Sequence, residues 1–114
     1  MTTIQDALDA LVAVLLGAGI AAGCDPAKLN PPCAWVHADQ FTIDNLDGSG
    51  TLGAFVDLAV PAWAYPQAMA ALTDLLGRAL SVITPDGPVE LDRAIDLTGG
   101  KTLPAFRIPL DLDL

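Results

Sequence analysis

The stretch of residues 29–60 constrains the fold of this chain more than any other part of it. It opens with the double proline Pro31-Pro32, continues into an apolar run, and turns in a segment rich in aspartate and glycine. Proline fixes φ and cannot donate a hydrogen bond to a sheet, so the pair marks the start of a strand and not its middle. The stretch therefore predicts an extended, protruding hairpin placed between two apolar helices.

Helical periodicity is present on both sides of this hairpin. Apolar residues recur at intervals of three and four over residues 4–16 and again over residues 69–83. Thr3 is a suitable N-cap for the first helix, and Pro66 suits the first turn of the second. The Pro85-Asp86-Gly87-Pro88 segment is expected to end the second helix.

Three segments alternate between apolar and other residues with the period of two that is typical of strands. They cover residues 52–60, 89–97 and 105–114. Pro109 lies inside the last segment, which favours an edge position or a bulge. The order helix, hairpin, helix, hairpin predicts a single α+β domain over residues 1–114, with two helices packed on one face of a mainly antiparallel sheet of four to five strands.

The chain is unusually apolar and strongly acidic. Hydrophobic residues make up 53% of its 114 residues, and a domain of this size has little interior, so we expect apolar surface to meet another subunit or a partner. The alternative explanation is an alanine bias, because Ala raises the count without adding much core. The net charge of −9 argues against direct phosphate binding, which requires clustered Lys and Arg.

The uncharged run of residues 10–24 is short for a membrane span, and Asp6 and Asp9 stand where a secretory signal would carry basic residues. We therefore expect a buried helix in a cytoplasmic protein without membrane contact. Cys24 and Cys33 are the two cysteines. A disulfide between them is left open, but two free buried thiols are favoured in the cytoplasm.

The loop Asp44-Asn45-Leu46-Asp47-Gly48-Ser49-Gly50-Thr51 resembles a calcium loop at first glance. An EF-hand needs oxygen ligands at loop positions 1, 3 and 5, Gly at 6 and Glu at 12. With Gly48 at position 6, Ile43 and Ala54 occupy positions 1 and 12, so two ligands are missing. A glycine-containing hairpin tip explains the loop better, and we expect neither a metal nor another cofactor.

His37 is the single histidine, and no motif of a catalytic site surrounds it. Cys24, Cys33 and His37 match no common zinc spacing. An enzyme built on Asp39, Asp57 and His37 is a weak alternative, because a chain with 13 aspartates brings some of them together by chance. We expect His37 to be a strand residue near the edge of the sheet and the protein not to be an enzyme.

Nearly the whole chain resembles the small tail-terminator (tail-completion) proteins of long-tailed phages, in particular those of actinobacterial phages. The resemblance is carried by the helix at residues 4–16, the segment Leu29-Asn30-Pro31-Pro32-Cys33-Ala34-Trp35-Val36, the strand at 53–60, the helix at 66–82, and the closing segment Gly99-Gly100-Lys101-Thr102-Leu103-Pro104-Ala105-Phe106-Arg107-Ile108-Pro109-Leu110. The family shares a layout and not an invariant motif, and head–tail connector and neck proteins have much of the same layout.

The resemblance implies a ring of the protein's own subunits, usually six, that caps the tail tube, stops its polymerisation and joins the tail to the head. The implied partners are the major tail tube protein and a head connector or neck protein, and DNA passes through the lumen without specific binding. The implied location is the tail–neck junction of the virion, after assembly in the host cytoplasm. Two alternatives stay open: a head–tail connector or neck protein (stopper or adaptor), and a small-molecule binding module in a helix–sheet groove near Trp35 and His37.

The candidate interface residues fall into three groups. Two tryptophans are suitable anchors, the hairpin tip would project towards the tube or the connector, and the last strand would contribute subunit contacts. The full set is Trp35, Asp44, Asn45, Asp47, Ser49, Thr51, Trp63, Leu110, Leu112 and Leu114.

Overall fold

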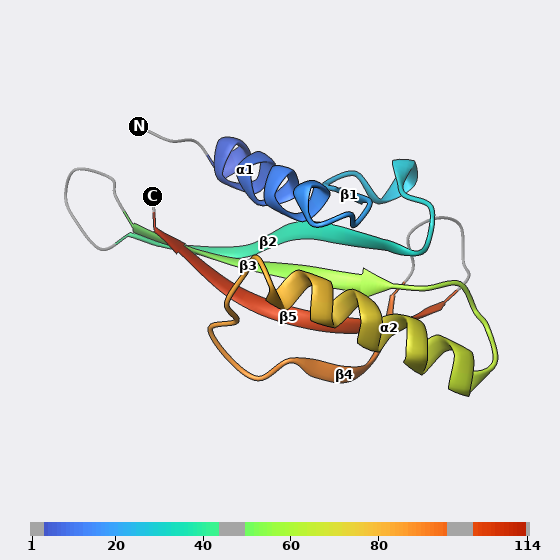
Figure 1. The fold of residues 1–114 in the computed structure, drawn as a ribbon. Helices are drawn as coiled ribbons and strands as arrows, with labels where there is room; N and C mark the ends of the chain where they lie inside the picture. The colour runs from blue at the N-terminus through green and yellow to red at the C-terminus, as the bar shows by residue number, and fades with distance from the viewer. Residues whose placement is uncertain (1–3, 44–49, 96–101, 114) are drawn as a thin grey trace.

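The computed structural model describes residues 4–43, 50–95 and 102–113 of the chain. Its elements are α1 (Ile4–Gly17), β1 (Ala22–Gly23), the short 3-10 helix η1 (Pro26–Lys28), β2 (Cys33–Ile43), β3 (Gly50–Ala59), α2 (Tyr65–Leu80), β4 (Glu90–Ile95) and β5 (Leu103–Asp113). The described strands form one sheet in the order β1-β2-β3-β5-β4 (Figure 1). This arrangement confirms the predicted α+β fold.

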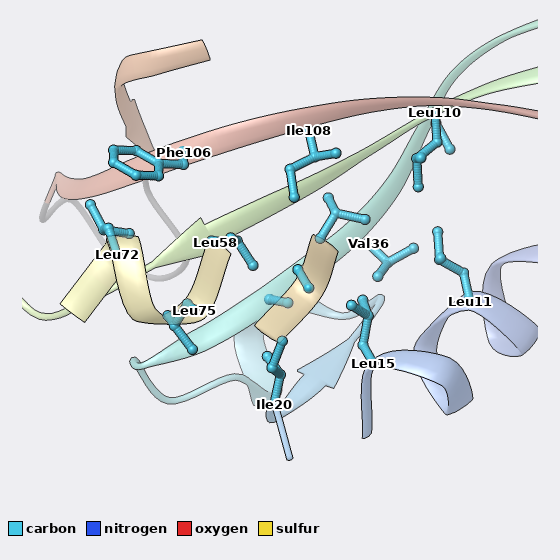
Figure 2. Packing of buried hydrophobic residues seen from close by; sticks show 14 of the residues in the cluster. Leu11, Leu15, Ile20, Val36, Leu58, Leu72, Leu75, Phe106, Ile108 and Leu110 are labelled. Atoms are coloured by element: carbon cyan, nitrogen blue, oxygen red, sulfur yellow. The ribbon is translucent and has the colours of Figure 1, made fainter. Parts of the chain in front are cut away.

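Both helices cover the same face of the sheet, as predicted. α1 contacts β1 and β2, and α2 contacts β3 and β5 (Figure 1). Beneath them, Val36, Val56 and Ile108 stand side by side on β2, β3 and β5 and are fully buried. Leu15 and Leu72 from the two helices complete this core (Figure 2). In the described part of the chain, no helix has the length and hydropathy that a membrane crossing requires.

The short strand β1 has no counterpart among the predicted elements. After α1 ends at Gly17, the chain turns through Gly19, whose φ of 82° is a left-handed conformation that glycine adopts without strain. The N–H of Ala34 then donates to the carbonyl of Ala21 at 2.7 Å, and Ala22 pairs with Ala34 in parallel. This pairing makes the sheet mixed, although the other pairs are antiparallel.

A β-bulge in β2 changes which residues face the core. The register with β3 shifts between Ala38 and Gln40, so β2 has one extra residue at Asp39. An extra residue reverses the alternation of side chains along the strand. As a result Phe41, an odd-numbered residue, packs against the same core as the even-numbered residues before the bulge.

β4 pairs with the first half of β5 only, up to Arg107. Beyond that point Asp86 takes the place of a strand. Its N–H donates to the carbonyl of Pro109 at 3.0 Å, and its Oδ2 accepts from the N–H of Asp111 at 2.7 Å. In the described residues Pro109 therefore lies on a part of β5 that has no strand on its outer side, which confirms the predicted edge position.

The end of the β2–β3 hairpin extends past both helices (Figure 1). The outer part of β2 is exposed, and the whole molecule is elongated, with dimensions of 50 × 30 × 24 Å. We call residues 38–43 and 50–53 the hairpin arm. Gly50 is required where the arm returns, because a Cβ at this position would collide with the backbone carbonyl of Thr42.

Cys24 and Cys33 are free thiols, as favoured from the sequence. Cys24 is half-buried on the helix side, where its Sγ lies 3.9 Å from Nε2 of Gln5. Cys33 is buried on the other side of the sheet, in contact with Ala59 and Ala105. The two thiols are therefore on opposite faces and cannot pair. Burial raises the pKa of Cys33 to about 11, so this thiol is protonated and inert at neutral pH.

Candidate functional site

The face of the sheet that carries no helix holds a group of polar and aromatic side chains. Trp35, Asp57 and Arg107 form one row across β2, β3 and β5, and His37 and Phe55 lie in the next row. Because side chains alternate along a strand, these residues point away from the core beneath the helices. We call these five residues the sheet-face cluster.

Asp57 is the centre of the sheet-face cluster and is 0% exposed. Arg107 forms a bidentate ion pair with Asp57: Nε donates to Oδ1 at 2.8 Å and Nη2 donates to Oδ2 at 3.0 Å. Nε2 of His37 lies 2.8 Å from Oδ2, and since the carboxylate accepts, this nitrogen carries the proton. These charge-assisted bonds replace the water that Asp57 loses on burial.

The charges in the cluster stabilise one another. Burial by itself would raise the pKa of Asp57, but the hydrogen bonds from His37 and Arg107 and the charge of Arg107 outweigh it and hold the pKa below its ordinary value. The hydrogen bond to Asp57 in turn raises the pKa of Arg107, as do the nearby carboxylates of Glu90 and Asp39. Asp57 and Arg107 are therefore both charged at neutral pH.

Aromatic rings hold the partners of Asp57 in place. Trp35 stacks on His37 with ring centroids 4.1 Å apart, and Phe55 lies 4.7 Å from the guanidinium carbon of Arg107. The indole Nε1 of Trp35 donates to the carbonyl of Cys24 at 3.2 Å. Both carboxylate oxygens of Asp57 thus have partners inside the chain, which is the arrangement of a structural ion pair.

The Asp57 site makes a specific prediction about acid stability. Because the pKa of Asp57 is lower in the folded protein than its ordinary value of 3.8, its ion pair contributes stability above that value and loses it as the pH falls further. The difference in unfolding free energy between the wild type and Asp57→Asn is therefore expected to shrink as the pH falls below 4. Urea denaturation of both proteins across this range measures it. A difference that stays constant down to pH 3 would contradict the assignment.

The predicted tryptophan anchors have different surroundings. Trp35 is part of the sheet-face cluster, and both Trp35 and His37 lie on the face without helices. They do not line a groove between helices and sheet, so the small-molecule site expected there is wrong as placed. Trp63, in contrast, is 45% exposed and stays a candidate interface residue.

The other predicted interface residues differ in burial, and some of them lie outside the described residues. Thr51 is half-buried in the arm, and Leu112 is half-buried against the core. The prediction that Leu110 is an interface residue is wrong. Its side chain is buried in the core beneath the helices (Figure 2), because the even-numbered face of β5 is covered at this point. Asp44, Asn45, Asp47, Ser49 and Leu114 lie outside the described residues.

Trp63 borders a cleft between the start of α2 and β4. The cleft has a volume of about 240 Å³, and Tyr65, Leu91 and Arg93 line it together with Trp63. Tyr65 and Leu91 are also exposed. Exposed aromatic side chains next to an arginine are typical of protein interfaces. We call this surface the aromatic cleft.

Sequence reasoning missed Arg107 as the partner of Asp57, and it missed Tyr65 and Leu91. One signal was present for the ion pair, because Asp57 stands between Val56 and Leu58 in an otherwise apolar strand, where an acid requires a partner. The sequence did not indicate which of the basic residues supplies it. Within the described ranges, no three His, Cys, Asp or Glu side chains come close enough to hold a metal ion.

No family model, curated protein or solved structure matches this chain. The resemblance to tail terminators therefore depends on the sequence features alone, and the function is a proposal.

Proposed function

We propose that this protein is a structural assembly protein, a tail terminator that forms a ring, caps a phage tail tube and joins it to a head connector. The observation that carries the proposal is the exposure of apolar side chains at two different places on an elongated molecule, Ile43 in the arm and Trp63 in the cleft. Two non-identical contact surfaces on one chain favour head-to-tail association, which gives a ring when the rotation from copy to copy closes.

The charge distribution supports the same role. With a net charge of −9, the protein repels a polyanion. Three of its arginines form ion pairs with carboxylates of the same chain: Arg78 with Asp74, Arg93 with Glu90, and Arg107 with Asp57. A ring of such subunits would let DNA pass through its lumen without holding it.

The proposal is tested with purified protein, alone and mixed with the major tail tube protein. We expect light scattering to give the mass of a ring, with six subunits by analogy with the family it resembles. Electron microscopy of tubes assembled with the protein is expected to show capped and shorter tubes than assembly without it. A protein that stays monomeric and neither caps nor shortens tubes would contradict the proposal.

A head–tail connector or neck protein is the second candidate, because such proteins share the layout on which the resemblance depends. The two functions differ in their direct partner. A terminator binds the end of the tail tube, whereas a stopper or adaptor binds the portal side of the junction. Co-sedimentation with tail tubes but not with isolated heads separates them.

A further inference from the structure

The aromatic cleft is an apolar surface bordered by one arginine, Arg93. Nη1 of Arg93 lies 3.3 Å from Oε2 of Glu90, but its Nε is buried and has no hydrogen-bond partner among the described residues. The Arg93 side chain as a whole is 35% exposed, so its positive charge can attract a carboxylate of a partner that covers the cleft. The cleft therefore suits a partner that is apolar and carries carboxylates.

The hairpin arm has the matching chemistry. Ile43 is 67% exposed, more than any other large aliphatic side chain among the described residues. Asp39 in the arm, and Asp111 and Asp113 in the adjoining part of β5, are exposed carboxylates. The described residues of the arm and residues 108–113 include no Lys or Arg. This end of the molecule is therefore both apolar and acidic.

The arm cannot fill the cleft of its own chain. β3 begins at Gly50 in the arm and ends at Ala59, from which the chain leads to Trp63 and α2. Ten residues of strand span about 33 Å, so the arm lies near the opposite end of the molecule from the start of α2 (Figure 1), where Trp63 and Tyr65 border the cleft. A match between them can therefore form only between two copies.

We propose that the hairpin arm of one copy docks in the aromatic cleft of the next copy, with Ile43 against Trp63 and the carboxylates of the arm close to Arg93. Each copy offers its arm to one neighbour and its cleft to another, so the contact is heterologous and repeats around a ring. This inference rests on the proposed ring assembly and names the surfaces that would hold the ring together.

The contact is tested with one variant on each surface. Ile43→Asp places a charge on the arm, and Trp63→Asp places one in the cleft. Leu16→Asp is the matched control, since Leu16 is 54% exposed on α1 and belongs to neither surface. By light scattering, we expect the first two variants to be monomers and the control to assemble like the wild type.

Mixing the two variants gives the decisive measurement. The Ile43→Asp copy retains an intact cleft, and the Trp63→Asp copy retains an intact arm, so an equimolar mixture is expected to form a one-to-one dimer that neither variant forms alone. Native mass spectrometry resolves the pair by mass. Tyr65→Asp is a second cleft variant if circular dichroism shows that Trp63→Asp does not fold.

The outcomes separate this contact from the proposed function. If the arm and cleft variants assemble like the wild type, the contact is wrong and ring formation stands. If the wild type is a monomer at high concentration and the mixture gives no dimer, both the contact and the proposed ring are wrong. If both variants are monomers but their mixture gives no dimer, the contact is also wrong. An intact arm and an intact cleft were then present in the mixture and did not bind each other.

Discussion

Replacing Asp57 by asparagine is expected to lower the free energy of unfolding by about 3 kcal/mol. The change removes the negative charge that Arg107 and His37 surround, while Arg107 is only 18% exposed and cannot turn fully to water. Removing one partner of a buried ion pair typically costs about 3–5 kcal/mol, and the partial exposure of Arg107 places this pair at the low end. Urea denaturation at pH 7 measures the loss.

The matched control for this variant is Asp74→Asn. Asp74 also bonds an arginine, with Oδ2 3.1 Å from Nη2 of Arg78, but both side chains are more than half exposed on α2. Exposed pairs of this kind contribute less than about 0.5 kcal/mol. Equal losses for the two variants would show that the burial of Asp57 does not matter energetically.

Replacing Phe106 by alanine is expected to cost about 3–5 kcal/mol, the usual range for a large aromatic side chain lost from a core. Phe106 is 2% exposed, pairs with Leu58 in the sheet and packs beneath α2 in the same core as Leu72 (Figure 2). Such a loss is a large part of the total stability of an ordinary domain, about 5–15 kcal/mol. A shift of the urea midpoint without a change in slope measures it.

Phe106→Leu and Leu16→Ala are the controls for this prediction. The first keeps most of the buried apolar volume and is expected to cost clearly less than the alanine variant. The second shortens an exposed side chain on α1 and is expected to cost less than about 1 kcal/mol. A Phe106→Ala protein as stable as Leu16→Ala would mean that β5 does not pack beneath α2.

The elements with strong local patterns were predictable from the sequence. The strand β3 and the helix α2 each carry a clear period and a marked boundary, so observed and predicted ends nearly coincide. β1 was not predictable, because two residues have no period and form a strand only by pairing with Ala34. The bulge at Asp39 also depends on tertiary pairing, and it moves Phe41 onto the core face.

The candidate interface was less predictable than the fold. The alternation in β5 predicts which side chains share a face, but not where the helices above that face end. Leu110 therefore lies in the core, although its pattern is the same as that of Leu112. The Asp57–Arg107 pair joins residues 50 positions apart, and no local pattern reports such a contact.

The position of β5 in the sheet has a consequence for synthesis. This strand follows all other described strands in the chain, yet it lies between β3 and β4. While a ribosome is still making the chain, the first hairpin and both helices emerge before β5. The edge of β3 that pairs with β5 is then unpaired, and Ile108 is missing from the core. A product that stops before β5 thus keeps an open sheet. Only copies translated through residue 113 can complete the five-stranded sheet, so the order of the strands alone would keep incomplete chains out of the proposed ring.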